Sequence, residues 1–238
     1  MKRKIIKAGR VVSINVALIF TALTVILILF AFYTNVPTQY DTEDKDIFER
    51  KLHLEPFRNP RTFAEEIVAI KTLQHRTFSI SPLGAGIPEY QTREPADFIA
   101  RREGLCFDRS RTTDKALSYM GLSSRHVYLL YQDGSRSLLS ALFHRRQPSH
   151  AVTEVKTRKG WMFIDSDTDW VALTRDGHPV SADEVYNRAA EFETFPSYLK
   201  QPWWAFRGIY SRRGQLYPPY IFFPNVNWPD FISWILFG

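Results

Sequence analysis

Residues 150–165 have the sequence HAVTEVKTRKGWMFID, and this stretch decides the fold class expected of the chain. β-Branched and aromatic residues occupy both of its halves, and the Arg-Lys-Gly tripeptide at 158–160 can form a turn between them. The pattern predicts a β-hairpin. With a two-residue turn, Asp165 lies opposite Val152, and His150 falls two residues further along the same face, within reach of the carboxylate. A shift of one residue would place His150 and Asp165 on opposite faces, so the register decides whether they meet.

Cys106 is the only cysteine of the chain, and it follows a turn at Gly104. Ala116, Leu117 and Met120 recur at helical spacing, so a helix is expected to begin at the cysteine. The free N–H groups and the dipole at a helix start favour a thiolate, and the same groups can stabilise an oxyanion. The alternative is a small buried apolar residue, which is the commoner fate of a free cysteine.

The remaining elements complete an α+β fold class. Asn59-Pro60 predicts the start of a helix, and residues 125–131 predict a strand after the cysteine helix. The capping box at 181–184 predicts a further helix toward Phe192. Because the hairpin joins its strands by a tight turn, we expect helices packed on an antiparallel sheet.

Four short blocks of the sequence occur in an order that is known from one superfamily. The blocks are Gly104–Asp108, Gly121–Val127, His150–Val155 and Gly160–Asp165. They resemble the transglutaminase-like (papain-like) superfamily, in which a Cys at a helix start precedes a Gly-Ile-Pro-Ala-Arg-like strand start, His-Ala-Trp-x-Glu-Val and Gly-Trp-x-x-x-Asp. The resemblance covers about residues 63–165. Val152 stands where the family often has Trp, and Ser166 stands where Pro or Thr is frequent.

The resemblance implies a transglutaminase-like domain with a role for each of three residues. It makes Cys106 the nucleophile, His150 the general base and acid, and Asp165 the group that orients His150. Relatives often supply a further oxyanion donor from a glutamine, and Gln91 is the candidate for it. The alternative interpretation of Gln91 is a glutamine of a surface loop.

The net charge of +6 is concentrated at the N-terminus, where five basic residues and no acid lie among the first ten. The rest of the chain carries only +1 (6 − 5) and shows no basic stripe with stacking aromatics, so no nucleic-acid partner is expected. Residues 11–33 carry no charge, and a helix over this run, rising ~1.5 Å per residue, crosses a hydrocarbon core of ~30 Å. A core helix and a cleaved signal peptide are the alternatives to an uncleaved single-pass anchor.

The charge distribution predicts an orientation in a bacterial inner membrane. By the positive-inside rule the N-terminus is cytoplasmic, so the chain after the anchor is periplasmic or otherwise extracytoplasmic. The expected organisation is a cytoplasmic basic segment (1–10), a transmembrane anchor (11–33), a juxtamembrane linker and helix (34–58), a transglutaminase-like catalytic domain (59–194) and an aromatic, proline-rich C-terminal extension (195–238). The extension could pack on the domain, bind a glycan or contact the membrane interface from Trp228 onward.

Cysteine-dependent acyl chemistry is the function expected of this chain. Hydrolysis of an amide or peptide through a thioester is the first expectation, and acyl transfer to an amine is the alternative. A non-catalytic binding or assembly role in an envelope polysaccharide complex is the competing class. The expected substrate is a protein, a peptide or a cell-envelope glycan. No cofactor or metal is expected, because the sequence has no Gly-rich phosphate loop, His-Glu-x-x-His or Cys-x-x-Cys; calcium at the acidic stretch 165–169 stays open.

Overall fold

The computed structural model describes residues 2–57, 62–81, 86–88, 91–142, 144, 147–210 and 225–237. The chain divides into two compact units, Met1–Asn35 and Val36–Gly238. The first unit contains helix α1 (Lys2–Thr34). Its part Asn15–Thr34 has a mean hydropathy of 2.7, and it is the one helix in the described part of the chain that is long and apolar enough to cross a membrane.

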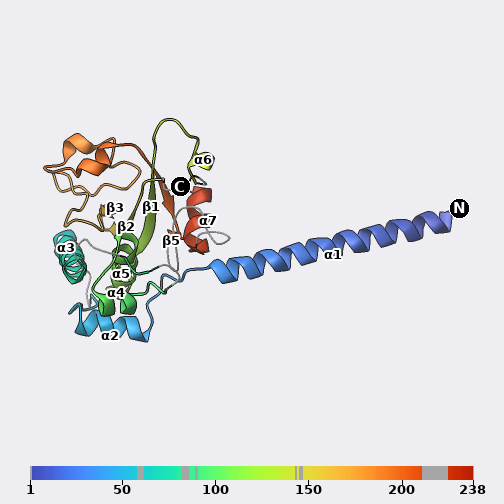
Figure 1. The fold of residues 1–238 in the computed structure, drawn as a ribbon, viewed down its shortest axis with the longest axis horizontal. Helices are drawn as coiled ribbons and strands as arrows, with labels where there is room; N and C mark the ends of the chain where they lie inside the picture. Colours follow the sequence, from blue (N-terminus) through green and yellow to red (C-terminus); the bar gives the residue numbers. More distant parts are fainter. Residues whose placement is uncertain are drawn as a thin grey trace. The chain divides into compact units, whose positions relative to one another are not determined.

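The second unit combines short helices with an antiparallel sheet, as Figure 1 shows. It is therefore a mixed α+β structure. Its elements in chain order are α2 (Thr42–Arg50), α3 (Phe63–Ile80), α4 (Pro95–Arg101), α5 (Cys106–Tyr119), β1 (Ser124–Tyr131), α6 (Leu138–Leu142), β2 (Ser149–Thr157), β3 (Gly160–Ile164), the 3-10 turns η1 (Ala189–Glu191) and η2 (Ser197–Lys200), β4 (Trp203–Arg207), β5 (Ile209–Tyr210), β6 (Asn225–Val226) and α7 (Trp228–Phe237).

Four strands pair antiparallel in the order β3-β2-β1-β4, and β5 pairs with β6 in a separate ribbon. In the β2–β3 hairpin Thr153 lies opposite Ile164, and the turn consists of residues 158–159. Continuing this register by one residue sets Asp165 opposite Val152. The predicted hairpin and its register are therefore confirmed.

The two faces of the sheet are covered by different parts of the chain. Side chains such as Tyr128, Ala151 and Val155 point to the face that α3, α5 and α7 cover. Val127 and Val152 point to the other face, where apolar residues between 170 and 199 pack on them. Successive residues of a strand alternate between faces, so this division follows from the register.

The stretch after Phe195 supplies part of the sheet and part of its cover. β4 pairs with β1 at one edge of the four strands. Helix α7 packs on β4 through Phe231 and Trp234. The aromatic residues of this stretch are thus partly built into the core of the second unit.

Two helices expected from the sequence can be compared with the structure only in part or differ from it. The helix start predicted at Asn59-Pro60 lies outside the described residues, and α3 is described from Phe63, with the Thr62 hydroxyl accepting the Glu65 N–H. Where the sequence predicts a helix toward Phe192, the structure has successive turns and only the short η1.

The prediction of a regular helix there is wrong: the stretch forms turns, and tertiary hydrogen bonds hold both of its ends. The Ala182 N–H donates to the buried Glu154 carboxylate at 2.6 Å. Arg175 donates to the carbonyls of Ala190 and Phe192 at 3.0 and 3.1 Å. A helix leaves these terminal groups without an internal partner, so the bonds fix the two ends of the stretch, and no contact among the described residues explains why its interior is not helical.

Candidate active site

Cys106 is the first residue of α5, a helix of 14 residues. Leu105 is the N-cap residue, and its N–H donates to the Asp108 carboxylate at 2.9 Å. Arg93 donates to both oxygens of the same carboxylate at 2.8 and 3.0 Å, and both side chains are buried. The first N–H groups of a helix have no acceptor within it, so those of Cys106 and Phe107 can stabilise negative charge.

The turn that leads into Cys106 has no room for a side chain. A Cβ atom at Gly104 would lie 2.7 Å from the Phe98 ring, and one at Gly86 would lie 2.6 Å from Cγ of Leu105. Real Cβ atoms do not approach other carbons this closely. Glycine at these two positions therefore lets neighbouring segments hold the start of α5 tightly.

His150 and Asp165, from the two strands of the hairpin, form a buried pair. Nε2 of His150 lies 2.8 Å from Oδ1 of Asp165. The carboxylate also accepts the Thr168 hydroxyl at 2.6 Å and the Asp167 N–H at 3.1 Å. These bonds hold the Asp165 carboxylate in one position. The carboxylate in turn holds the His150 ring in one orientation relative to the sheet.

The charge state of this pair follows from its neighbours. Burial disfavours a charge on His150, but hydrogen bonds to Asp165 and Cys106 and the negative charge of both groups raise its pKa to about 10. Burial acts to raise the pKa of Asp165, and the hydrogen bond and charge of His150 outweigh it, leaving the pKa below its usual value. At neutral pH His150 is therefore an imidazolium between the carboxylate and the sulfur. Nε2 faces Asp165, and Nδ1 lies 3.7 Å from Oδ2 of Asp167.

Two buried side chains connect the parts of the chain that carry these residues. Arg109 of α5 donates to the carbonyl of Gly104 at 2.6 Å and to that of Ser166 at 2.5 Å. Gln74 of α3 donates to the carbonyl of Asp165 at 2.8 Å. Arg109 thus joins the turn before Cys106 to the loop after β3, and Gln74 joins the same loop to α3.

Tyr198 packs against His150, and no sequence motif predicts this contact. Its ring centroid lies 4.9 Å from that of His150 in an edge-to-face arrangement. Burial and the negative charges of Asp165 and Cys106 raise the pKa of the phenol, which stays protonated. A short irregular stretch before β4 carries Tyr198, and such a stretch has no periodicity that predicts its position.

The structure does not bring Gln91 to this cluster. Its side chain is exposed, and Arg101 donates to its amide oxygen. Among the described contacts none joins Gln91 to Cys106 or His150. The surface-loop interpretation fits this position better than the oxyanion role.

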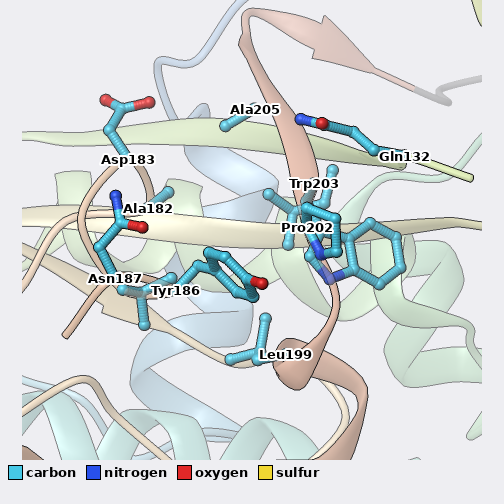
Figure 2. Close-up of a pocket in the computed structure, with 11 residues that line it drawn as sticks. Gln132, Ala182, Asp183, Tyr186, Asn187, Leu199, Pro202, Trp203 and Ala205 are labelled. Atoms are coloured by element: carbon cyan, nitrogen blue, oxygen red, sulfur yellow. The ribbon is translucent and has the colours of Figure 1, made fainter. Parts of the chain in front are cut away.

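A pocket of about 230 Å³ lies beside the cluster, on the sheet face that carries Leu129. Tyr186 and Trp203 contribute aromatic rings to its wall, as Figure 2 shows. Its lining includes neither the cysteine nor the His–Asp pair. Trp203 also contacts Tyr198, with ring centroids 6.3 Å apart, so the phenol ring separates the pocket from His150.

The acidic stretch after β3 is engaged with basic side chains. Asp165 faces His150, Asp167 pairs with Arg109, and Asp169 lies 3.2 Å from His75. In the described part of the chain no group of three or more His, Cys, Asp or Glu side chains is placed to hold a metal ion.

Comparisons with known proteins give little beyond the geometry. No family model and no curated protein matches the sequence. One solved structure that matches is a crystal structure of a TGase, with a TM-score of 0.37 and 15% identity over 62% of this chain and 37% of that chain. The chain thus covers little more than a third of that protein's length. The likeness is weak, and the side-chain geometry carries the proposal below.

Proposed function

We propose that this chain is a membrane-anchored enzyme of cysteine-dependent acyl chemistry, with Cys106 as nucleophile, His150 as general acid and base, and Asp165 as the residue that positions His150. One observation carries the proposal. Cys106 lies at a helix N-terminus, near enough to the buried His150 for its negative charge to raise the pKa of that histidine, and Nε2 of His150 faces a buried carboxylate. Thiol catalysis requires a nucleophile, a base and a group that orients the base, and Cys106, His150 and Asp165 are the three residues proposed for these roles.

The chemistry follows from the imidazolium. The Cys106 thiolate attacks the carbonyl carbon of an amide or ester, and the oxyanion is stabilised by the N–H groups at the start of α5. As the bond to the leaving group breaks, Nδ1 of His150 gives its proton to the departing nitrogen or oxygen and a thioester remains. The neutral imidazole then takes a proton from water, the hydroxide attacks the thioester, and the acid is released as the thiolate re-forms.

Water is the acceptor that we propose, which makes the enzyme a hydrolase of an amide or peptide bond. An amine in place of water would make the same thioester an intermediate of acyl transfer. The substrate class is a protein, a peptide or a cell-envelope glycan, reached from the extracytoplasmic side of the membrane. The proposed catalytic domain is residues 59–194, and the proposed anchor is residues 11–33.

The proposal is tested by the alkylation rate of Cys106 in the full-length protein in detergent at pH 7. Since the chain has one cysteine, an intact mass reports that residue alone. A free thiol at this pH is only a few per cent thiolate, so we expect the wild-type protein to react with iodoacetamide about tenfold faster than glutathione or more. His150→Ala removes most of this excess, and Asp165→Ala removes a smaller part.

His144→Ala is the matched control, because residue 144 is exposed. This variant reacts like the wild type. The proposal is overturned if Cys106 reacts only after denaturation, or if the wild-type, His150→Ala and Asp165→Ala proteins all react at one rate. Circular dichroism of each variant separates a chemical effect from loss of the fold.

A further inference from the structure

Helix α7 has two apolar faces, and the second unit covers only one of them. Phe231 and Trp234 point inward, and Trp234 meets Phe206 of β4 with ring centroids 5.5 Å apart. On the other side of the helix Ile232, Ile235 and Leu236 are 50%, 61% and 64% exposed, and Phe237 at the end of the helix is 85% exposed. Figure 1 shows α7 beside β5 at the C-terminal end of the described chain. An exposed apolar face of this kind marks a contact with another surface.

The chain segment that precedes α7 is hydrogen-bonded to Val36, which is two residues after the end of α1. The Val36 N–H donates to the Val226 carbonyl at 2.9 Å, and the Asn227 side-chain amide donates to the Val36 carbonyl at 2.8 Å. Val36 and Val226 are both fully buried. The start of α7 is thus fixed to residue 36 within the second unit.

Val36 must lie close to the end of α1, because only one residue separates it from Thr34 in the chain. Helix α1 ends at Thr34, and consecutive Cα atoms are ~3.8 Å apart, so Thr34 and Val36 lie within ~8 Å whatever direction α1 takes. If α1 spans a bilayer, the start of α7 lies within ~20 Å of the point at which the chain leaves it, because Trp228 is two residues after the strand residue that is bonded to Val36. Helix α7 is 10 residues long, about 15 Å, which is too short to span.

We propose that the exposed side of α7, formed by Ile232, Ile235 and Leu236, lies in the headgroup and acyl boundary of the bilayer that α1 spans. Interfacial helices bury an apolar face to this depth, and aromatic residues favour the same region. Two attachments, one spanning and one interfacial, would hold the second unit in one orientation on the membrane. This inference rests on the proposed membrane anchor.

The experiment uses the full-length protein in phosphatidylcholine nanodiscs. In a Cys106→Ser background, a single cysteine at Ile235 is labelled with the environment-sensitive fluorophore NBD, and lipids carrying a nitroxide near the headgroup are the quencher. A label at Leu27 within α1 reports the anchor, and a label at the exposed Ser135 is the control. We expect a blue-shifted emission and quenching several-fold stronger at position 235 than at position 135.

The labels separate the two ways in which the inference can fail. If the label at position 27 is not quenched even by nitroxides placed deep in the acyl chains, the anchor itself is wrong. If position 27 is quenched and position 235 behaves like position 135, the anchor stands and the interfacial role of α7 is refuted. Blue-shifted emission at 235 without lipid quenching, together with cross-linking between copies, would show that a second copy covers this face and would also refute the proposal.

Discussion

Replacing Gly104 by alanine perturbs the start of α5 without removing or adding a charge. The added Cβ would lie 2.7 and 2.8 Å from two Phe98 ring carbons and 3.1 Å from Cβ of Asp108. Carbon atoms at rest are ~3.5–4.0 Å apart, so the turn and the ring must separate by about 1 Å. Overpacking of this kind costs about 1–3 kcal/mol, which for a domain of this size lowers Tm by roughly 2–12 °C.

The same displacement changes the chemistry, because Cys106 is two residues further along the chain. A shift of about 1 Å between reacting groups costs on the order of 100-fold in rate, and we expect Cys106 alkylation in Gly104→Ala to fall toward that of a free thiol. The assay combines a thermal melt with the iodoacetamide rate on the full-length protein in detergent.

Gly177→Ala is the control for loss of a glycine. A Cβ there meets open space, but φ is +72°, so the substitution costs about 1 kcal/mol in backbone strain. It should lower Tm slightly and leave the alkylation rate unchanged. If Gly104→Ala melts and reacts like the wild type, the turn is not packed as described and it does not position the cysteine.

Two further predictions concern groups around His150. Its pKa is raised from 6.5 to about 10, so its contribution to the free energy of unfolding is complete below pH ~6.5 and is lost as the pH rises toward 10, by no more than ~5 kcal/mol. Thermal melts from pH 6 to 10 should show this loss in the wild type and a smaller one in His150→Gln; equal slopes would contradict it. Tyr198→Phe keeps the ring that contacts His150 edge-to-face but removes a buried hydroxyl that has no hydrogen-bond partner among the described residues. We expect a rate of acylation by an activated ester that is about tenfold lower or more at nearly unchanged Tm, and an equal or higher rate would contradict the donor role.

The local part of the site was predictable from the sequence, and the long-range part was not. The hairpin turn has two residues and the side chains alternate, so the meeting of His150 and Asp165 follows from strand geometry alone. The position of Cys106 at a helix start follows from the glycine before it and the apolar spacing after it. Arg109 and Tyr198 gave no such signal, because their roles depend on contacts with residues about 50 positions away or more.

The errors have physical causes of the same kind. The capping box at 181–184 is a valid local signal for a helix start, but the residues after it form turns whose ends are held by the buried Glu154 carboxylate and by Arg175. Gln91 was chosen only for its residue type and approximate place, and its side chain lies on the surface with Arg101. Sequence patterns report local preference, and tertiary hydrogen bonds outweigh it where they are buried.

The most direct test of the central claim is the intact mass of the full-length protein after a brief exposure to p-nitrophenyl acetate at pH 7, together with the nitrophenolate burst. The account predicts one acetyl group per chain, attached to Cys106 as a thioester that hydroxylamine removes, no thioester in Cys106→Ser, and a burst at least tenfold slower in His150→Ala. Acetylation of lysines alone, or a burst in His150→Ala as fast as in the wild type, would contradict it.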